Sequence, residues 1–189
     1  GATVVIVAPQ RWLGGQMRSQ GVSALDEHRY IEAFGGSPHY LQLRQRIRQR
    51  MASLYGITIT DATTFNPGNA WVSNLCFFPQ VATDAITEFL APYVANQRLT
   101  ILYQTVPRAV AKTDQMLTNI TCHNTDGAQY AISPQIVIDA SEHGDILALA
   151  DLSYVTGAEA QTDTGEHNAP LTARPHEIQG FTFGFAVEF

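Results

Sequence analysis

Lysine, cysteine and long apolar runs are all scarce in this sequence of 189 residues. Lysine occurs once, at Lys112, and two cysteines, Cys76 and Cys122, are too few for a disulfide framework. We expect both thiols to be small buried side chains in a reducing compartment, which favours a cytoplasmic protein. No apolar run approaches the ~18 residues of a membrane helix, and the start, Gly1–Val7, lacks the basic region of a signal peptide.

Positive charge is the scarcer sign. Lys and Arg number 11 against 17 Asp and Glu, and the net charge of −6 argues against a nucleic-acid-binding surface. The basic residues that do cluster are expected to form the solvated face of one helix: Arg44, Arg46, Arg48 and Arg50. With 45% apolar and 15% charged residues, the chain has the composition of a folded globular protein of one domain or slightly more.

Local patterns predict the elements of the N-terminal half. The β-branched run Thr3–Ala8 is typical of a buried parallel strand. Gly14, Gly15 and Gly21 follow it, which indicates a loop whose backbone passes close to another group, with a plain turn as the alternative. Ser37 before Pro38 predicts a helix start and Gly56 its end; a second helix is expected from Pro79.

The C-terminal half predicts strands first. Segments Leu99–Val106, Met116–His123 and Gln129–Ser133 are rich in β-branched and aromatic residues, and an Asn-Thr-Asp-Gly turn separates the last two. They predict an antiparallel meander that covers a parallel sheet formed by Thr3–Val7 and Ile136–Ile138. Beyond Asp151 the chain is predicted to be mostly loop, with a final strand at 181–187.

The stretch Ile136–Ala150 predicts a strand, a tight turn and a helix start. Such a turn directs backbone N–H groups and the positive end of a helix dipole at whatever lies above it, and its small residues let a flat ligand or a pyrophosphate approach. An ordinary strand-to-helix connection is the alternative. Ser141, His143 and Asp145 do not form a catalytic triad, because triad members come from separated parts of a chain. No metal is expected, because the spacing of the acids and His143 fits no common ligand pattern.

Four stretches, taken in order, resemble the FAD-dependent oxidoreductases with a glutathione-reductase-type dinucleotide fold, and in particular a bacterial group of them. The sequences VVIVAPQRWLGG at 4–15 and QMRSQGVSALDEH at 16–28 resemble a strand, its Leu-Gly-Gly loop and the segment beside the flavin. WVSNLCFFPQVA at 71–82 resembles a signature of the bacterial group, and residues 136–150 resemble the strand that returns to the cofactor.

The resemblance implies an α/β fold: an incomplete parallel dinucleotide-binding sheet, inserted helices and a small antiparallel β-meander. The implied partial FAD-binding domain is 1–150, with a helical insertion at 37–96 and a meander at 99–133, and a substrate domain begins at 151–189. The implied cofactor contacts are Gly14, Gly15, Gln16, Val106, Ala140, Ser141, Gly144 and Asp145. The implied reaction moves electrons or hydride between a small-molecule substrate and FAD.

Two departures from the family qualify this picture. No Gly-x-Gly-x-x-Gly turn occurs, and Ala8 stands where the family usually has an acid for the adenosine ribose. We therefore expect a fragment of a flavoenzyme that holds FAD weakly or not at all, although the full-length parent should carry it.

Candidates for chemistry other than the cofactor's own are few. Asp26 and His28 follow the glycine loop and are candidates for proton transfer, with a structural role as the alternative for each. A non-catalytic α/β module that contributes only packing or a partner surface is the rival function. A serine or cysteine hydrolase is disfavoured, because no nucleophile elbow occurs and no basic residue lies near Cys76 in the sequence.

Overall fold

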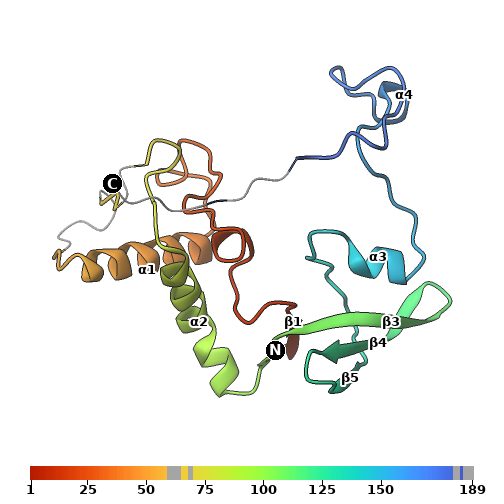
Figure 1. Cartoon of the computed structure of the whole chain (residues 1–189), viewed down its shortest axis with the longest axis horizontal. Coiled ribbons are helices and arrows are strands. Elements are labelled where there is room, and N and C mark those ends of the chain that lie inside the picture. Colours follow the sequence, from red (N-terminus) through yellow and green to blue (C-terminus); the bar gives the residue numbers. More distant parts are fainter. Residues whose placement is uncertain (59–64, 68–69, 181–183, 185–189) are drawn as a thin grey trace. The chain divides into compact units, whose positions relative to one another are not determined.

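The computed structural model describes residues 1–58, 65–67, 70–180 and 184 (Figure 1). The chain divides into two compact units, an N-terminal unit over Gly1–Gln104 and a C-terminal unit over Thr105–Thr182. Together they hold a parallel strand pair, two long helices and a three-stranded antiparallel sheet, which confirms the predicted α/β class. The domain limits expected from the sequence, 1–150 and 151–189, remain predictions.

A parallel pair of strands opens the N-terminal unit. Strand β1 (Val4–Val7) pairs with β2 (Leu99–Leu102), with Val4 opposite Leu99 and Val7 opposite Leu102. A parallel strand is thus present within the predicted range Thr3–Ala8, but the expected burial is wrong, since Val4 and Val5 are 47% and 40% exposed. Its partner also differs from the prediction. Residues 99–102 therefore do not belong to the antiparallel meander, which corrects the expected limits of that element.

The expected strand Ile136–Ile138 does not form. Its residues pair with no strand in the part of the chain that the structure describes, and Ile136 and Ile138 are 82% and 83% exposed. The prediction that this segment shares a sheet with β1 is wrong. An apolar β-branched run has strand propensity, but it becomes a strand only where a neighbour supplies hydrogen bonds.

Two long helices lie in the N-terminal unit (Figure 1). Helix α1 (Pro38–Leu54) begins as predicted, since the Ser37 hydroxyl accepts the Tyr40 amide at 3.2 Å, and Gly56 follows its end with φ 63°. Helix α2 (Pro79–Ala95) also begins at the predicted proline. The two helices pack together around one apolar cluster. Its buried members are Ile47, Met51, Leu75, Phe77, Val81, Ala82 and Ala85.

The C-terminal unit is built on an antiparallel sheet. Strands β3 (Thr105–Thr113), β4 (Met116–Asn124) and β5 (Gln129–Ile132) pair in that order, which confirms a meander over these residues. The Asn124 carboxamide oxygen accepts the amides of Asp126 and Ala128, and Gly127 has φ 88°, so the predicted turn forms.

Two short helices complete the C-terminal unit. Helix α3 (Asp145–Leu149) packs against β3, where Lys112 donates a hydrogen bond to the carbonyl of Ala150 at the helix end. Helix α4 (Gln161–Thr164) lies in a segment predicted as loop. The strand predicted at 181–187 lies outside the described residues, Gly184 excepted.

Candidate functional site: the glycine loop and the α3 turn

The glycine loop follows β1 and is a tight, open turn. Gly14 has φ 130° and Gly15 has φ 50°, conformations that side-chain-bearing residues rarely adopt. A short 3₁₀ helix, η1 (Gly15–Met17), begins there, with the Met17 amide donating to Gly14 at 3.0 Å and the Ser19 amide to Gly15 at 2.8 Å. A Cβ added at Gly15 would meet nothing within 4 Å. The backbone of Gly15 is therefore open to a ligand.

Helix α2 holds this loop in place. Thr83 is buried on α2, and its single hydroxyl proton has two carbonyl acceptors within reach, that of Leu13 at 3.2 Å and, in its own helix, that of Pro79 at 3.3 Å. The added Cβ at Gly14 would lie 3.8 Å from the same hydroxyl. Helix α2 packs in the apolar cluster, so the hydrogen bond from Thr83 fixes the position of the loop relative to that cluster.

Arg18 and Trp12 flank the glycine pair. The guanidinium of Arg18 lies 4.5 Å from the centre of the Trp12 ring, and the Trp12 indole donates to the Ser19 hydroxyl at 3.2 Å. Nε of Arg18 is buried and has no hydrogen-bond partner. The loop thus carries a cation that no acid or carbonyl among the described residues satisfies.

The predicted proton-transfer residues lie downstream and are exposed. His28 accepts the Tyr30 amide through Nδ1 at 3.2 Å and packs near Tyr30 and Phe34, with ring centres 6.4 and 6.1 Å away. A Cβ at Gly35 would come within 2.7 Å of Nε2 of His28. These contacts fit a packed surface histidine. The catalytic assignment of Asp26 and His28 stays a prediction.

A buried ionic network lies between this segment and α1, and sequence reasoning missed it. Arg44, only 2% exposed, pairs with Glu27 and with Glu32, the latter at 2.7 Å. Arg48 also pairs with Glu32 and donates to the carbonyl of Phe65 at 2.8 Å. The expected solvated face is therefore wrong for these two arginines. Their positions relative to Ile47 and Met51 were the signal, since all four fall on one helical face.

Two hydroxyls complete the network around Glu27. Tyr40 donates to one carboxylate oxygen, and Ser73 donates to the other at 3.1 Å. Burial and the contact with the Glu27 carboxylate raise the pKa of Tyr40 to about 12. Burial acts to raise the pKa of Glu32, but Arg44 and Arg48 outweigh it and lower the pKa below 4.5. The network is a clamp of paired charges, and we call it the Glu27–Arg44 clamp.

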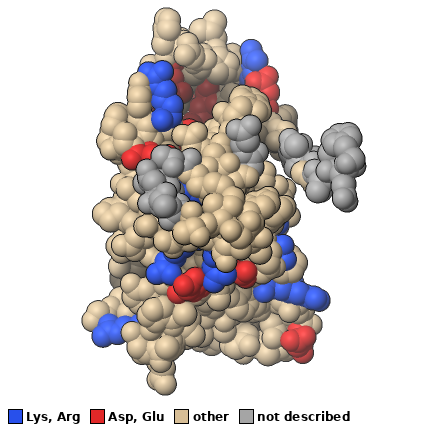
Figure 2. Space-filling view, turned by 90° about the vertical axis from the view of Figure 1, so that its left-hand side faces the viewer, with Lys and Arg blue, Asp and Glu red and all other residues tan. Residues whose placement is uncertain are grey.

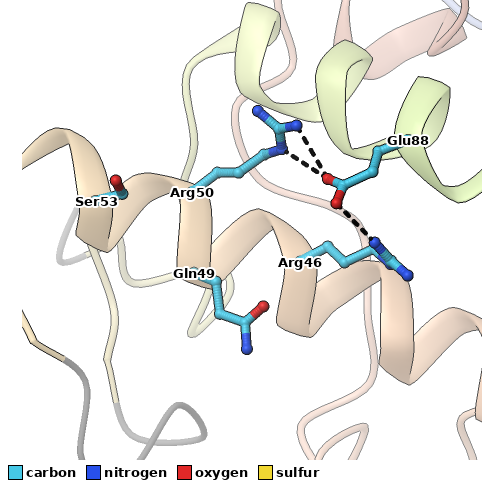
Figure 3. Close-up of a pocket in the computed structure, with 5 residues that line it drawn as sticks. All are labelled: Arg46, Gln49, Arg50, Ser53 and Glu88. Atoms are coloured by element: carbon cyan, nitrogen blue, oxygen red, sulfur yellow. Dashed lines mark hydrogen bonds and ion pairs between the residues drawn. The ribbon is translucent and has the colours of Figure 1, made fainter.

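The other two arginines of α1 behave as predicted. Figure 3 shows Arg46 and Arg50 directed at Glu88 of α2, with Gln49 extending away from it. Arg46 lies 3.1 Å and Arg50 2.9 Å from the Glu88 carboxylate. Together with Ser53, these four residues line a depression of about 280 Å³. On the face drawn in Figure 2, basic and acidic side chains stand beside one another and most of the surface is uncharged.

The α3 turn, residues 139–146, satisfies its own backbone. One Asp139 carboxylate oxygen accepts the amide and hydroxyl of Ser141 at 3.0 and 2.7 Å. The other accepts the Ile146 amide at 2.8 Å, and the Ser141 hydroxyl accepts the Asp145 amide at 2.9 Å. Burial acts to raise the pKa of Asp139, but these hydrogen bonds outweigh it and hold the pKa below 3.8. A carboxylate already occupies the helix start.

The predicted cofactor contacts thus fall into two groups. Gly14, Gly15 and Gln16 lie together in the N-terminal unit. In the C-terminal unit, Gly144 precedes α3 with φ 67° and Asp145 begins the helix. Ala140 and Ser141 share that turn, and Val106 lies in β3 opposite His123.

The cysteines show no sign of activation. Cys122 is fully buried in β4, and burial raises the pKa of its thiol. Burial also raises the pKa of Cys76, with a backbone hydrogen bond from Ala70 acting weakly in the other direction. Raised pKa values disfavour the thiolate, which fits a packing role for both residues. The expected burial holds for Cys122, whereas Cys76 is only partly buried. No group of three or more potential metal ligands occurs in the described part of the chain, and none of its helices could span a membrane.

A glycine loop at the carboxyl end of a parallel strand is an arrangement typical of dinucleotide-binding α/β proteins. The family model for FAD dependent oxidoreductases matches residues 1–185, and the chain therefore belongs to the FAD dependent oxidoreductase family. No curated protein and no solved structure matches the chain.

Proposed function

We propose that this chain contributes to the flavin site of an oxidoreductase that moves electrons or hydride between a small-molecule substrate and FAD. The observation that carries this proposal, beside the family match, is the open backbone at Gly15 after β1. When bound, the flavin supplies the redox chemistry, and the protein's part is to bind and orient it.

The glycine loop fits a dinucleotide. Gly14 and Gly15 let the backbone approach the ligand without a Cβ in the way, and Gln16 lies at the start of η1 beside them. Thr83 supports the loop from α2. These residues would bind and orient the cofactor.

The α3 turn fits a different kind of contact. Its first amides already bind Asp139 and Ser141, so an added phosphate there would face a carboxylate instead of free donors. For Ala140, Ser141, Gly144 and Asp145 we therefore propose a close approach of backbone to an uncharged part of the cofactor. We also propose that the backbone at Val106 lies beside the adenine, which is another uncharged part of the cofactor.

Titration of the chain with FAD tests the proposal. We expect a dissociation constant in the millimolar range, because no Gly-x-Gly-x-x-Gly turn supplies amide donors and Ala8 replaces the usual ribose-binding acid. Gly15→Val should abolish this binding by filling the open space above the loop. Gly56→Val is the matched control, since Gly56 also has a left-handed backbone and open surroundings in the same unit.

The rival function is a non-catalytic module. It is favoured by the predicted proton-transfer residues, because Asp26 and His28 are both exposed and the His28 ring lies near the Phe34 ring. Absence of any FAD binding at millimolar concentration would support this rival. A submicromolar dissociation constant would instead show that the weak-binding prediction is wrong.

A further inference from the structure

Arg18 is a charged residue of the glycine loop with no role in the function proposed above. It comes three residues after Gly15, and the added Cβ at Gly14 would lie 3.1 Å from its own Cβ. Its guanidinium lies over Trp12, and its Nε is buried without a partner. Buried donors are nearly always hydrogen-bonded in folded proteins, so an orphaned one next to a candidate binding loop calls for an acceptor.

The arginines of helix α1 differ from Arg18 in having acidic partners, although Nε of Arg44 is also buried without a hydrogen-bond partner. Arg44 pairs with the buried Glu27 and with Glu32, and Arg48 pairs with Glu32. Arg46 and Arg50 pair with Glu88 of α2. Arg29 lies over the Tyr30 ring at 4.4 Å, which resembles the pairing of Arg18 with Trp12, but Arg29 is exposed. Water can therefore satisfy Arg29, whereas it does not reach Nε of Arg18.

We propose that Arg18 binds a phosphate group of a nucleotide that occupies the glycine loop. This rests on the proposed function, and it adds a charged, phosphate-specific contact to a loop otherwise recognised only by its glycines. The planar guanidinium matches phosphate geometry through parallel N–H donors. Stacking on Trp12 fixes its plane before the ligand arrives, which reduces the loss of side-chain entropy on binding.

Backbone donors for a phosphate are few among residues 1–189. Without a Gly-x-Gly-x-x-Gly turn, few backbone donors are available for a pyrophosphate. The start of α3 does not replace them, because its amides bind Asp139 and Ser141. Arg18 supplies a positively charged donor directly beside the glycine pair.

Titration of three ligands with the wild-type chain and its variants tests this assignment. The ligands are FAD and ADP, which carry phosphates, and riboflavin, which carries none; ligand-observed NMR detects binding in the millimolar range. Arg18→Gln should weaken FAD and ADP binding about tenfold, equal to ~1.4 kcal/mol, and leave riboflavin unchanged. Arg18→Lys should lie between wild type and Arg18→Gln, because it keeps the charge and loses the planar fork. Arg29→Gln is the matched control and should change no ligand.

Each other outcome counts against the assignment. Equal loss of riboflavin and FAD would show that Arg18 acts through the flavin ring or through packing. An effect of Arg29→Gln as large as that of Arg18→Gln would reduce the contact to general charge. If wild type binds FAD and Arg18→Gln binds it equally well, only the Arg18 assignment fails; if wild type binds none of the ligands, the proposed function fails with it.

Thermal unfolding of each variant, followed by circular dichroism, verifies that the fold is kept. Should Arg18→Gln not fold, the salt dependence of the wild type and of Arg18→Lys gives the answer. A phosphate contact predicts that added salt weakens FAD and ADP binding and leaves riboflavin binding unchanged; no difference between the ligands would overturn it.

Discussion

The glycine loop and the α3 turn have similar sequence features, but they differ in how far each satisfies its own hydrogen-bonding groups. Both place a glycine with positive φ at the start of a short helix: Gly15 is the first residue of η1, and Gly144 directly precedes α3. The α3 turn satisfies its own amides with Asp139 and Ser141. The glycine loop instead leaves Gly15 open and Arg18 without a partner. A turn that caps itself has little left to offer a ligand.

The two turns also differ in what holds them. The α3 turn depends on residues within seven positions of one another. The glycine loop depends on distant ones, through Thr83 and through the segment that follows it. In that segment, the Val22 amide donates to Gln16 at 3.0 Å, the Phe77 amide donates to Ser23 at 3.0 Å, and Glu27 enters the clamp with Arg44. Substitutions far from the loop should therefore disturb it, whereas the side-chain hydrogen bonds of the α3 turn should respond mainly to local substitutions.

The largest expected loss of folding stability comes from Arg44→Met. This change leaves the buried Glu27 carboxylate without its cation, and breaking one side of a buried ion pair costs about 3–5 kcal/mol. Urea denaturation measures the loss, and hydrogen exchange should show faster exchange at 15–28 with little change at 141–149. Arg46→Met, which removes a partly exposed pair, should cost no more than about 1 kcal/mol. Equal losses for the two variants would contradict the clamp.

Tyr40→Phe should have the next largest effect. Its hydroxyl binds the Glu27 carboxylate, and hydrogen bonds to charged groups are worth about 1.5–3 kcal/mol. Because the pKa of Tyr40 is about 12 in the folded chain against an ordinary 10.0, this stabilisation is complete below pH 10.0. It is lost as the pH rises through about 12.

Alkaline titration of stability checks the sign of this prediction. Wild type should lose stability between pH 10.0 and about 12 by more than Tyr40→Phe does, with the loss centred on the N-terminal unit. Parallel curves for the two proteins would show that Tyr40 titrates normally and that the bond to Glu27 is weak.

Thr83→Val should have a smaller effect, of about 1 kcal/mol, because it removes one hydroxyl that bonds the Leu13 carbonyl and keeps the side-chain shape. The substitution should be detected as faster hydrogen exchange of the Met17 and Ser19 amides. Thr87→Val is the matched control, since the Thr87 hydroxyl bonds only its own helix, at the Thr83 carbonyl. If both variants loosen the loop alike, Thr83 is not its anchor.

Asp139→Ala should have the smallest global effect. Loss of a helix-capping side chain costs about 0.5–2 kcal/mol, and α3 has only five residues, so the change should appear as local fraying. Hydrogen exchange at Asp145 and Ile146 measures it, with Glu142→Ala, an exposed acid of the same turn, as control.

The pH dependence of this turn gives an independent check on Asp139. The pKa of Asp139 is lowered from 3.8, so capping is complete above that pH and is lost as the pH falls through the folded value. Acid should therefore open the α3 turn in wild type and leave Asp139→Ala unchanged. Protection that persists in Asp139→Ala would show that α3 does not need its cap.

Elements set by local chemistry could be predicted from the sequence. Ser37 before Pro38 fixed a helix start, and the Asn124 turn fixed a hairpin, because each signal acts within a few residues. The segment Ile136–Ile138 could not be predicted in this way. Its residues favour a strand, but strand formation depends on a neighbour that no local pattern reveals.

The charged residues of the site taught a second lesson. An arginine-rich helix usually presents those arginines to water, yet Arg44 and Arg48 are buried on the apolar face and pair with carboxylates of the segment before the helix. Helical spacing alone placed them on that face, but their acidic partners, Glu27 and Glu32, carry no such pattern. The orphaned Nε of Arg18 likewise becomes visible only when the distances are known.

The single lysine of the chain has a consequence for chemical labelling. Lys112 donates to the carbonyl of Ala150, at the end of the helix that packs on β3. Lys112 is exposed, so an amine-reactive reagent can reach it and attach a label beside the end of α3. A spectroscopic label at this position would report on the environment of the helix end without an engineered residue.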